Sequence, residues 1–167
     1  MPFTLRNYSP HDRDECLSVF RTNVPTFFRD HELNDFEQFI DASGCLYFVV
    51  LEDDEIVGCG GYGLTDDSET ADLCWGMARA DLHGKRVGEF LLLGRLHTII
   101  ENTVANAVRL STSQLTDGFF RHYGFELQSI KHDGIATGLD DVEMRLELND
   151  ATKQTIIGKW EEVTDGS

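Results

Sequence analysis

The residues best suited to chemistry lie in a glycine-bearing turn at 82–89, with the sequence Leu-His-Gly-Lys-Arg-Val-Gly-Glu. A stretch with strand character, 70–78, precedes this turn, and 90–100 follows it with apolar residues at helical spacing. The first N–H groups of a helix have no partner within the helix, and together with the helix dipole they favour an anion. Lys85 and Arg86 add two cations at this point. The turn therefore predicts a site for a phosphate-bearing ligand; the alternative is an ordinary turn with two solvated cations.

The spacing within the turn excludes two common phosphate-binding motifs. The P-loop pattern Gly-x-x-x-x-Gly-Lys-Ser/Thr is missing, and so is the dinucleotide pattern Gly-x-Gly-x-x-Gly. The role of the turn therefore depends on the elements around it.

Charge narrows the range of partners. The 167 residues include 14 basic and 30 acidic side chains, which gives a formal net charge of −16. This charge argues against nucleic acid, because phosphate binding needs clustered cations. It favours cationic or neutral substrates, and the alternative is an acidic surface that only aids solubility.

Cysteine spacing and hydropathy exclude further classes of protein. The four cysteines form no Cys-x-x-Cys pair and have no histidine at zinc-ligand spacing, so no metal is expected. No apolar run approaches the length of a membrane span, and the N-terminus lacks the apolar core of a signal sequence. We therefore expect a cytoplasmic protein with reduced thiols and no membrane partner.

The chain is long enough for one domain with its own core, built from strands and helices. Ser9 before Pro10 marks a helix start, and Gly124 marks a left-handed helix end. A polar loop is expected at 131–140, and the tail from 149 is expected as a helix or a docked segment. The predicted strands are 3–8, 45–51, 55–64, 70–78, 107–113, 125–130 and 142–148; the predicted helices are 10 to about 23, 30–42, the turn to about 104, and 117–123.

In this order, β-α-α-β-β-β-α-β-α-β-β, the elements resemble the GNAT superfamily of acyl-coenzyme A-dependent N-acyltransferases over residues 3–148. The segment 70–93 looks like the family's strand, Gln/Arg-x-x-Gly-x-Gly/Ala pyrophosphate loop and helix. The segment 119–125, Phe-Phe-Arg-His-Tyr-Gly-Phe, is similar to the family's Phe-Tyr-x-x-x-Gly-Phe. The resemblance implies an α+β or α/β fold whose mixed, mostly antiparallel central sheet is splayed at its central strands and flanked by helices. It also implies one domain at 1–148, with 149–167 as a docked or partly flexible C-terminal extension.

The resemblance implies that the chain binds acetyl-coenzyme A. The family's Gln/Arg falls on His83, its first glycine on Arg86 and its last on Gly88, so two of these three positions depart from the pattern. Backbone amides can still cradle the pyrophosphate, while Arg86 either crowds the ligand or adds a charge-assisted contact. The family lays the pantetheine arm along the strand before the loop, where Gly76 allows a bulge. The residues expected at coenzyme A are Met77, Ala78, His83, Gly84, Lys85, Arg86, Val87, Gly88, Glu89, Ser113 and Phe120.

For catalysis, the resemblance implies a base on the strand 70–78. Histone-acetylating members place a glutamate eleven residues before the Gln/Arg position, which is Asp72 here. Partial burial in a strand would raise the pKa of this carboxylate toward a useful value, and the alternative is a solvent-facing strand residue. The family tyrosine that protonates the leaving thiolate is replaced by Phe120. The expected acid is then Tyr123, one helical turn further on, with Ser113 or a water as the alternatives.

The acceptor is expected near the second predicted helix, since that region forms the acceptor wall in the family. Glu32 and Phe28 are the expected acceptor-binding residues. The alternatives are a solvated or helix-terminal charge for Glu32 and a core aromatic for Phe28.

These expectations give one preferred function and two alternatives. The preferred function is an N-acetyltransferase that moves an acetyl group from acetyl-coenzyme A to an amine of a small cationic acceptor by direct attack in a ternary complex. The first alternative is a non-catalytic module that binds or senses acyl-coenzyme A, which the missing tyrosine would suit. The second is a scaffold that binds a basic protein through its acidic surface. An exposed strand edge and the tail also leave room for a homodimer.

Overall fold

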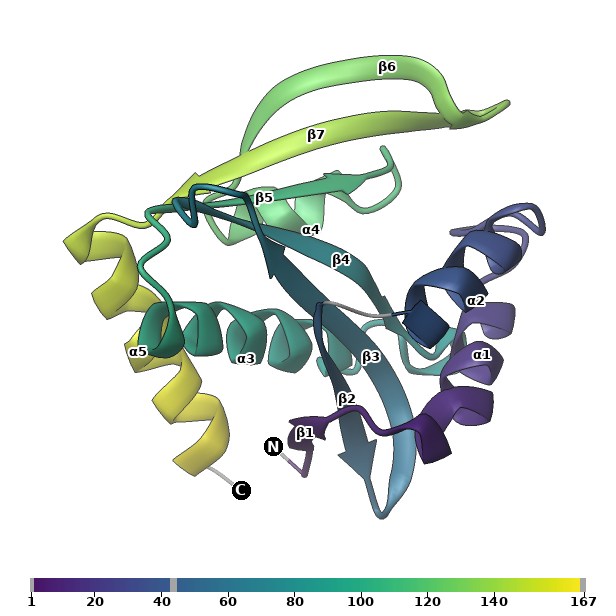
Figure 1. Cartoon of the computed structure of the whole chain (residues 1–167), viewed down its shortest axis with the longest axis horizontal. Helices are drawn as coiled ribbons and strands as arrows, with labels where there is room; N and C mark the ends of the chain where they lie inside the picture. Colours follow the sequence, from purple (N-terminus) through teal and green to yellow (C-terminus); the bar gives the residue numbers. More distant parts are fainter. Residues whose placement is uncertain (1, 43–44, 166–167) are drawn as a thin grey trace.

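A mixed sheet of seven strands forms the centre of the computed structural model, which describes residues 2–42 and 45–165 (Figure 1). The strands lie in the order β1-β2-β3-β4-β5-β7-β6, and the neighbours are antiparallel except for β4 and β5, which are parallel. This is the predicted fold class. The strands are β1 Thr4–Asn7, β2 Leu46–Glu52, β3 Glu55–Leu64, β4 Thr70–Ala78, β5 Ala107–Thr112, β6 Glu126–Ala136 and β7 Leu139–Glu147.

Helices cover both faces of the sheet. Phe20 of α1 and Phe36 of α2 pack with Tyr47 of β2 on one face. Leu92 of α3 packs with Ile156 of α5 on the other face. The helices are α1 Arg13–Thr22, α2 Glu32–Ala42, α3 Val87–Asn102, α4 Asp117–His122 and α5 Asp150–Asp165, with short 3-10 turns at Pro10–Asp12 and Ala80–Leu82.

Two helix-boundary predictions are confirmed, because the expected side chains and backbone angles are present. Ser9 caps the turn that leads into α1, in a reciprocal capping box with Asp12. Gly124 follows α4 with a φ of +94°, the left-handed value that favours glycine. Local sequence therefore sets these boundaries.

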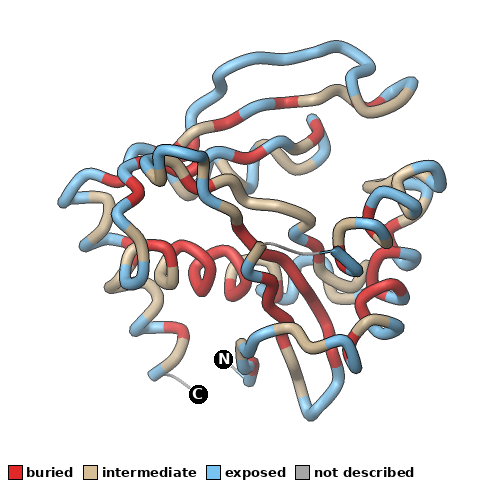
Figure 2. The backbone as a smooth tube through the Cα atoms, in the orientation of Figure 1, coloured by how far each residue is buried: buried red, intermediate tan, exposed pale blue. Residues whose placement is uncertain are grey.

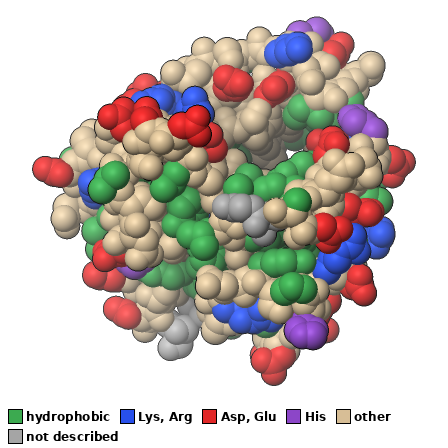
Figure 3. Space-filling view, in the orientation of Figure 1, with side chains coloured by type: hydrophobic (Ala, Val, Ile, Leu, Met, Phe, Trp, Pro, Cys, Tyr) green, Lys and Arg blue, Asp and Glu red, His purple; other side chains and the backbone are tan. Residues whose placement is uncertain are grey.

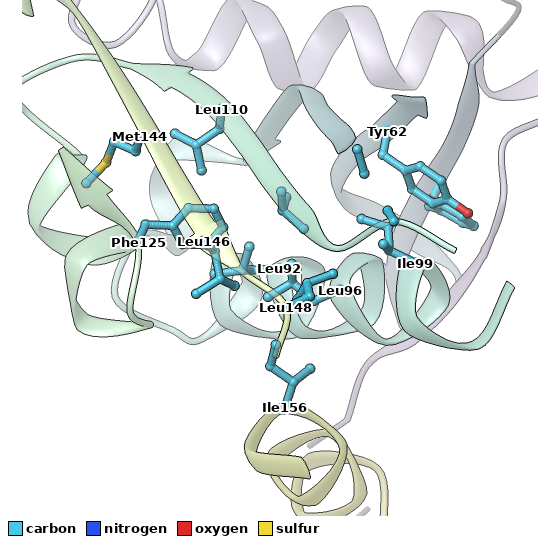
Figure 4. Close-up of a cluster of buried hydrophobic side chains, with 14 of the residues drawn as sticks. Tyr62, Leu92, Leu96, Ile99, Leu110, Phe125, Met144, Leu146, Leu148 and Ile156 are labelled. Carbon is cyan, nitrogen blue, oxygen red and sulfur yellow. The ribbon is translucent and has the colours of Figure 1, made fainter. Parts of the chain in front are cut away.

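The central helix α3 is buried along most of its length (Figure 2). Its apolar side chains face the sheet on one side and α5 on the other, and Leu92, Leu96 and Ile99 lie in one continuous core cluster (Figure 4). The helix α5 approaches α3 closely at Gly94, where a β-carbon would lie 3.1 Å from the ring of Trp160. The helix that carries the predicted phosphate site is thus held from both sides.

The predicted polar loop at 131–140 is wrong. These residues continue β6 and β7 as a long hairpin with a two-residue turn at 137–138, where Gly138 has a φ of +81° (Figure 1). The outer half of β6, beyond the predicted strand 125–130, is mostly exposed, and its sequence has no apolar alternation that could reveal a strand. Backbone pairing with β7 forms the strand here, without burial of its side chains.

None of the helices in the described part of the chain is both long enough and apolar enough to span a membrane.

Candidate active site

The sheet splits between its two central parallel strands. β4 pairs with β5 only from Thr70 to Asp72, opposite Ala107 to Arg109. On its other side β4 stays paired with β3 as far as Ala78. The edge of β4 that faces β5 is therefore free from Leu73 onward. A free strand edge presents N–H and C=O groups to an extended ligand.

A β-bulge lies within this free stretch of β4. Met77 pairs with Cys59 and Cys74 pairs with Gly61, so Trp75 and Gly76 together oppose one residue of β3. Trp75 has a φ of +46°, and the Tyr47 hydroxyl donates a hydrogen bond to its carbonyl at 2.7 Å. The bulge predicted at Gly76 is confirmed.

The N-terminus of α3 lies just after this strand and is open. Arg86 is the N-cap residue, and its side chain caps none of the backbone N–H groups. Among the described residues, the first backbone bond of the helix runs from the Phe90 N–H to the Arg86 carbonyl, and no acceptor faces the N–H groups of Val87, Gly88 and Glu89. Unpaired donors of this kind at a helix N-terminus favour an anion. Arg86 itself has a φ of +73°, so a non-glycine residue holds the left-handed conformation at the position of the family's first glycine.

Charged side chains surround this open helix end. Arg86 forms an ion pair with Glu89 at 2.7 Å, while Lys85 is exposed. Glu89 also interacts with the Tyr123 hydroxyl, and Lys159 of α5 lies 5.0 Å from the Tyr123 ring centroid. Burial alone would raise the pKa of Glu89, but Arg86 and Tyr123 hold it below its usual value. Burial, and then Glu89, raise the pKa of Tyr123.

Two shallow cavities flank the start of α3. One of about 510 Å³ lies beside the 3-10 turn Ala80–Leu82 and the start of the chain before β1. The other, of about 470 Å³, lies between α3, α4 and α5. Arg86 lines both cavities, Val87 lines the first and Glu89 lines the second. The first is lined by Pro2, Phe3, Glu52, Leu82, Lys85, Arg86 and Val87, and the second by Arg86, Glu89, His122, Tyr123, Lys159, Glu162 and Val163.

Asp72, the expected base, lies at the point where β4 and β5 separate. Arg109 donates to both of its carboxylate oxygens, at 2.7 and 2.9 Å, and the Asp72 side chain is 46% exposed. Ala71 packs in the core with Leu92, so strand alternation puts Asp72 on the sheet face opposite α3. The burial expected for Asp72 is therefore wrong: the side chain is half exposed and is paired with Arg109 of β5, a partner that the sequence did not reveal.

The α4 residues contribute apolar surface next to the open helix end. A β-carbon at Gly88 would lie 3.8 Å from the Phe119 ring, and Phe120 packs against Phe119 and Phe125 at centroid distances of 5.1 and 5.8 Å. Tyr123 points to Glu89 and α5 instead of to the free edge of β4.

Ser113 is buried at the start of the turn into α4. Its hydroxyl accepts a hydrogen bond from the Leu115 N–H at 3.2 Å, and its carbonyl accepts from the N–H groups of Thr116 and Asp117. These bonds give it a structural role in the turn.

The expected acceptor residues have packing and capping partners. The Glu32 carboxylate accepts a hydrogen bond from the Arg29 N–H at 2.8 Å, as a helix-terminal charge does. Phe28 stacks on Phe20 at 4.9 Å and lies 6.2 Å from Trp75. Phe28 belongs to an aromatic group that supports the bulge, and this group also includes Phe36, Phe39 and Tyr47.

The remaining expected coenzyme A residues lie at the end of β4 and in the turn that connects β4 to α3. The Met77 side chain is buried against α1, so only its backbone faces the free edge. The Ala78 carbonyl accepts a hydrogen bond from Asn23 at 2.9 Å and lies 3.1 Å from the His83 Nε2. His83 also contacts Phe27 edge to face. Gly84 has a φ of +81°, which fits a glycine in this turn.

Sequence reasoning missed two features. Arg95 of α3 is buried under β3 and β4, and its signal was a charged residue within an apolar helix face. In the β6–β7 hairpin, His132, Asp133 and Asp140 place their ligand atoms within 4.8 Å of one another, a grouping that depends on the unpredicted strand pairing.

Comparisons with known proteins agree with this geometry. Residues 12–148 match the family model described as the acetyltransferase (GNAT) domain. None of the curated proteins matches the sequence. The fold is similar to Ard1 from Thermoplasma volcanium (TM-score 0.71, 16% identity, 90% of this chain and 100% of that one). It is also similar to the ribosomal-protein-S18-alanine N-acetyltransferase from Escherichia coli (0.72, 15%, 88% and 94%) and to an aminoglycoside 6′-N-acetyltransferase complexed with coenzyme A (0.70, 12%, 87% and 97%).

Proposed function

Because the chain belongs to the GNAT acetyltransferase family and is an acyltransferase, we propose that it moves an acetyl group from acetyl-coenzyme A to the amine of a small cationic acceptor. One observation carries this proposal: the open N–H groups at the start of α3 adjoin the edge of β4 that β5 leaves free. An anion site next to a free strand edge suits a ligand with phosphates at one end and an extended, amide-bearing arm.

The fit to coenzyme A rests on groups of the backbone. The N–H groups of Val87, Gly88 and Glu89 would hold the pyrophosphate, and Lys85 and Arg86 would add charge. The free edge from Leu73 to Ala78 would hold the pantetheine amides. Bound there, acetyl-coenzyme A supplies a thioester whose carbonyl carbon an amine can attack.

Acidic groups on the sheet face opposite α3 support a cationic acceptor. Asp72 lies at the point where the strands separate, and Asp67 and Glu143 both act on Arg109 beside it. In the proposed reaction the acceptor amine attacks in a ternary complex and Asp72 takes its proton. On the face seen in Figure 3, a hollow opens below the β6–β7 hairpin with hydrophobic side chains beneath it, and we assign the acceptor to this side.

The acceptor class follows from charge. GNAT enzymes act on small-molecule or protein amines, and two of the similar structures are named for an aminoglycoside and for a ribosomal-protein alanine. The net charge of −16 and the carboxylates near Asp72 favour a small amine that carries further positive charge.

Calorimetric titration of acetyl-coenzyme A into the protein tests the binding part. We expect micromolar binding, with the affinity reduced at least about tenfold in Lys85→Glu because a cation beside the pyrophosphate becomes an anion. Lys131→Glu, on the distant β6–β7 hairpin, makes the same charge change and should bind as the wild type does. An equal loss of affinity in both variants would show that the change in net charge causes the effect. No binding at millimolar acetyl-coenzyme A would refute the proposal.

A second candidate, a non-catalytic acyl-coenzyme A-binding module, is favoured by Phe120, which has no proton to donate. Assays of Phe120→Tyr with a panel of amines separate the two. The transferase is supported if the wild-type enzyme turns over and Phe120→Tyr raises its activity less than about tenfold. An inactive wild type that gains activity from this change supports the module.

A further inference from the structure

Arg95 is a buried cation with no acidic partner. Its side chain extends from α3 toward the sheet, and the residue is only 4% exposed. Nε and Nη1 lie 3.4 Å from the carbonyls of Leu91 and Gly61, which are long hydrogen bonds. No carboxylate among the described residues pairs with it. A buried charge with so little compensation calls for an anion.

Two glycines make room for the guanidinium and leave it close to the free edge of β4. A β-carbon at Gly60 would lie 3.2 Å from Cζ, and one at Gly76 would lie 2.8 Å from Nη2. Among the described residues, one fully buried polar side-chain atom lacks a hydrogen-bond partner, and it is the Tyr62 hydroxyl. The hydrogen bonds of the guanidinium to described residues use Nε and Nη1 and leave Nη2, the nitrogen nearest to Gly76, without an acceptor.

The guanidinium lies at the expected far end of the ligand. β4 enters the turn and α3 leaves it in the opposite direction, and Arg95 is about 12 Å along the helix axis from Val87. Gly76 belongs to the bulge within the free edge of β4. A ligand anchored at the start of α3 and extended along β4 from Ala78 therefore reaches Gly76, beside which Nη2 lies.

The titratable groups that face Arg95 are Tyr47 of β2, Cys59 of β3 and Cys74 of β4. Burial lowers the pKa of Arg95 to about 10, so the guanidinium is still a cation at neutral pH. Burial raises the pKa of Tyr47 well above its usual value and that of Cys74 to about 12. Tyr47 and Cys74 are therefore neutral at neutral pH and leave the cation unneutralised.

We propose that Arg95 stabilises the negative charge that forms on the coenzyme A sulfur when the thioester is cleaved. This inference rests on the proposed function. The amine nitrogen bonds to the carbonyl carbon, the carbon–sulfur bond breaks, and its electron pair leaves on sulfur as thiolate. The amine proton goes to the base, and the guanidinium keeps its own protons while it pairs with the thiolate. Arg95 thus supplies by charge what the tyrosine at the position of Phe120 supplies elsewhere by proton transfer.

The affinities of free coenzyme A and desulfo-coenzyme A, measured by calorimetry from pH 6 to pH 9, test this without any turnover. If Arg95 pairs with the thiolate, the bound thiol has a pKa at least one unit below the value of about 8.5 for a free thiol. The preference for coenzyme A over desulfo-coenzyme A then rises with pH by about tenfold or more and levels off above pH 8.5. A ratio that does not change with pH in the wild type overturns the proposal.

Two variants identify the residue responsible. Arg95→Met should abolish the rise in the ratio while desulfo-coenzyme A still binds, and Arg95→Lys should keep part of it. Arg145→Met, which removes an arginine from β7, is the matched control and should behave as the wild type does. A full rise in folded Arg95→Met would also overturn the proposal. Failure of desulfo-coenzyme A to bind the wild type would instead refute the proposed function.

Discussion

Asp72 and Arg109 form a two-bonded ion pair at the last position where β4 and β5 are paired. Beyond this pair the strands separate, so the ion pair lies at the closed end of the split in the sheet. Both side chains are about half exposed, which limits the contribution of the pair to the free energy of unfolding. Its position points to function more than to stability.

Asp72→Asn tests that function. If Asp72 takes the amine proton, the variant loses about 10²–10⁴-fold in kcat/KM, because one acid–base partner is removed. Its free energy of unfolding should change by less than about 1 kcal/mol. Steady-state kinetics and urea unfolding give both values, and Arg109→Met shows the effect of losing the ion pair alone. A loss in kcat/KM for Asp72→Asn that stays well below about 10²-fold would remove Asp72 from the mechanism.

Arg86→Gly should leave the protein at least as stable. The φ of +73° at Arg86 suits glycine, and the change removes the strain of a side chain in that conformation. The loss of the Arg86–Glu89 ion pair is a small opposing effect, since Arg86 is exposed. We expect the thermal midpoint to stay equal or to rise by up to about 4 °C in a calorimetric scan. A clear fall in the midpoint would mean that the ion pair outweighs the strain.

Gly88→Ala separates ligand binding from folding. A β-carbon at Gly88 would meet the Phe119 ring at an ordinary 3.8 Å, and alanine is the better helix former. Stability should therefore be unchanged or higher. Acetyl-coenzyme A should bind about tenfold more weakly, because the methyl group lies beside the N–H groups that face the phosphates. Gly118→Ala in α4, where a β-carbon meets nothing within 4 Å, is the control and should leave binding unchanged. Equal binding by both variants would place the phosphates elsewhere.

Two buried tyrosines on neighbouring strands should respond in opposite ways to replacement by phenylalanine. The Tyr62 hydroxyl is buried without a partner, so Tyr62→Phe should raise the free energy of unfolding by about 1 kcal/mol. The Tyr47 hydroxyl donates to the Trp75 carbonyl at the bulge, so Tyr47→Phe should lower it by about 1–3 kcal/mol. Urea unfolding measures both. A loss of stability in Tyr62→Phe would reveal a partner for its hydroxyl, such as an ordered water.

The sequence predicted the order of the elements and the open helix end, because both depend on local patterns. Apolar periodicity fixes α3, and the glycines of the turn fix how the chain enters it. Gly76 likewise indicated the bulge in β4. Such features need only a few neighbouring residues, so one sequence is enough to read them.

The sequence failed where strands pair without burying side chains. The outer half of the β6–β7 hairpin has no apolar alternation, and only its backbone hydrogen bonds make it a strand. The grouping of His132, Asp133 and Asp140 follows from that pairing and was equally hidden.

By itself, the sequence determined the family resemblance, the element order and the open helix end at the start of α3. The tertiary structure alone decided what each candidate side chain faces. It paired Asp72 with Arg109, turned Tyr123 toward Glu89 and buried Arg95 under Gly60 and Gly76. The physical reason is that these contacts join residues distant in sequence, and their charge and burial depend on which strands lie side by side.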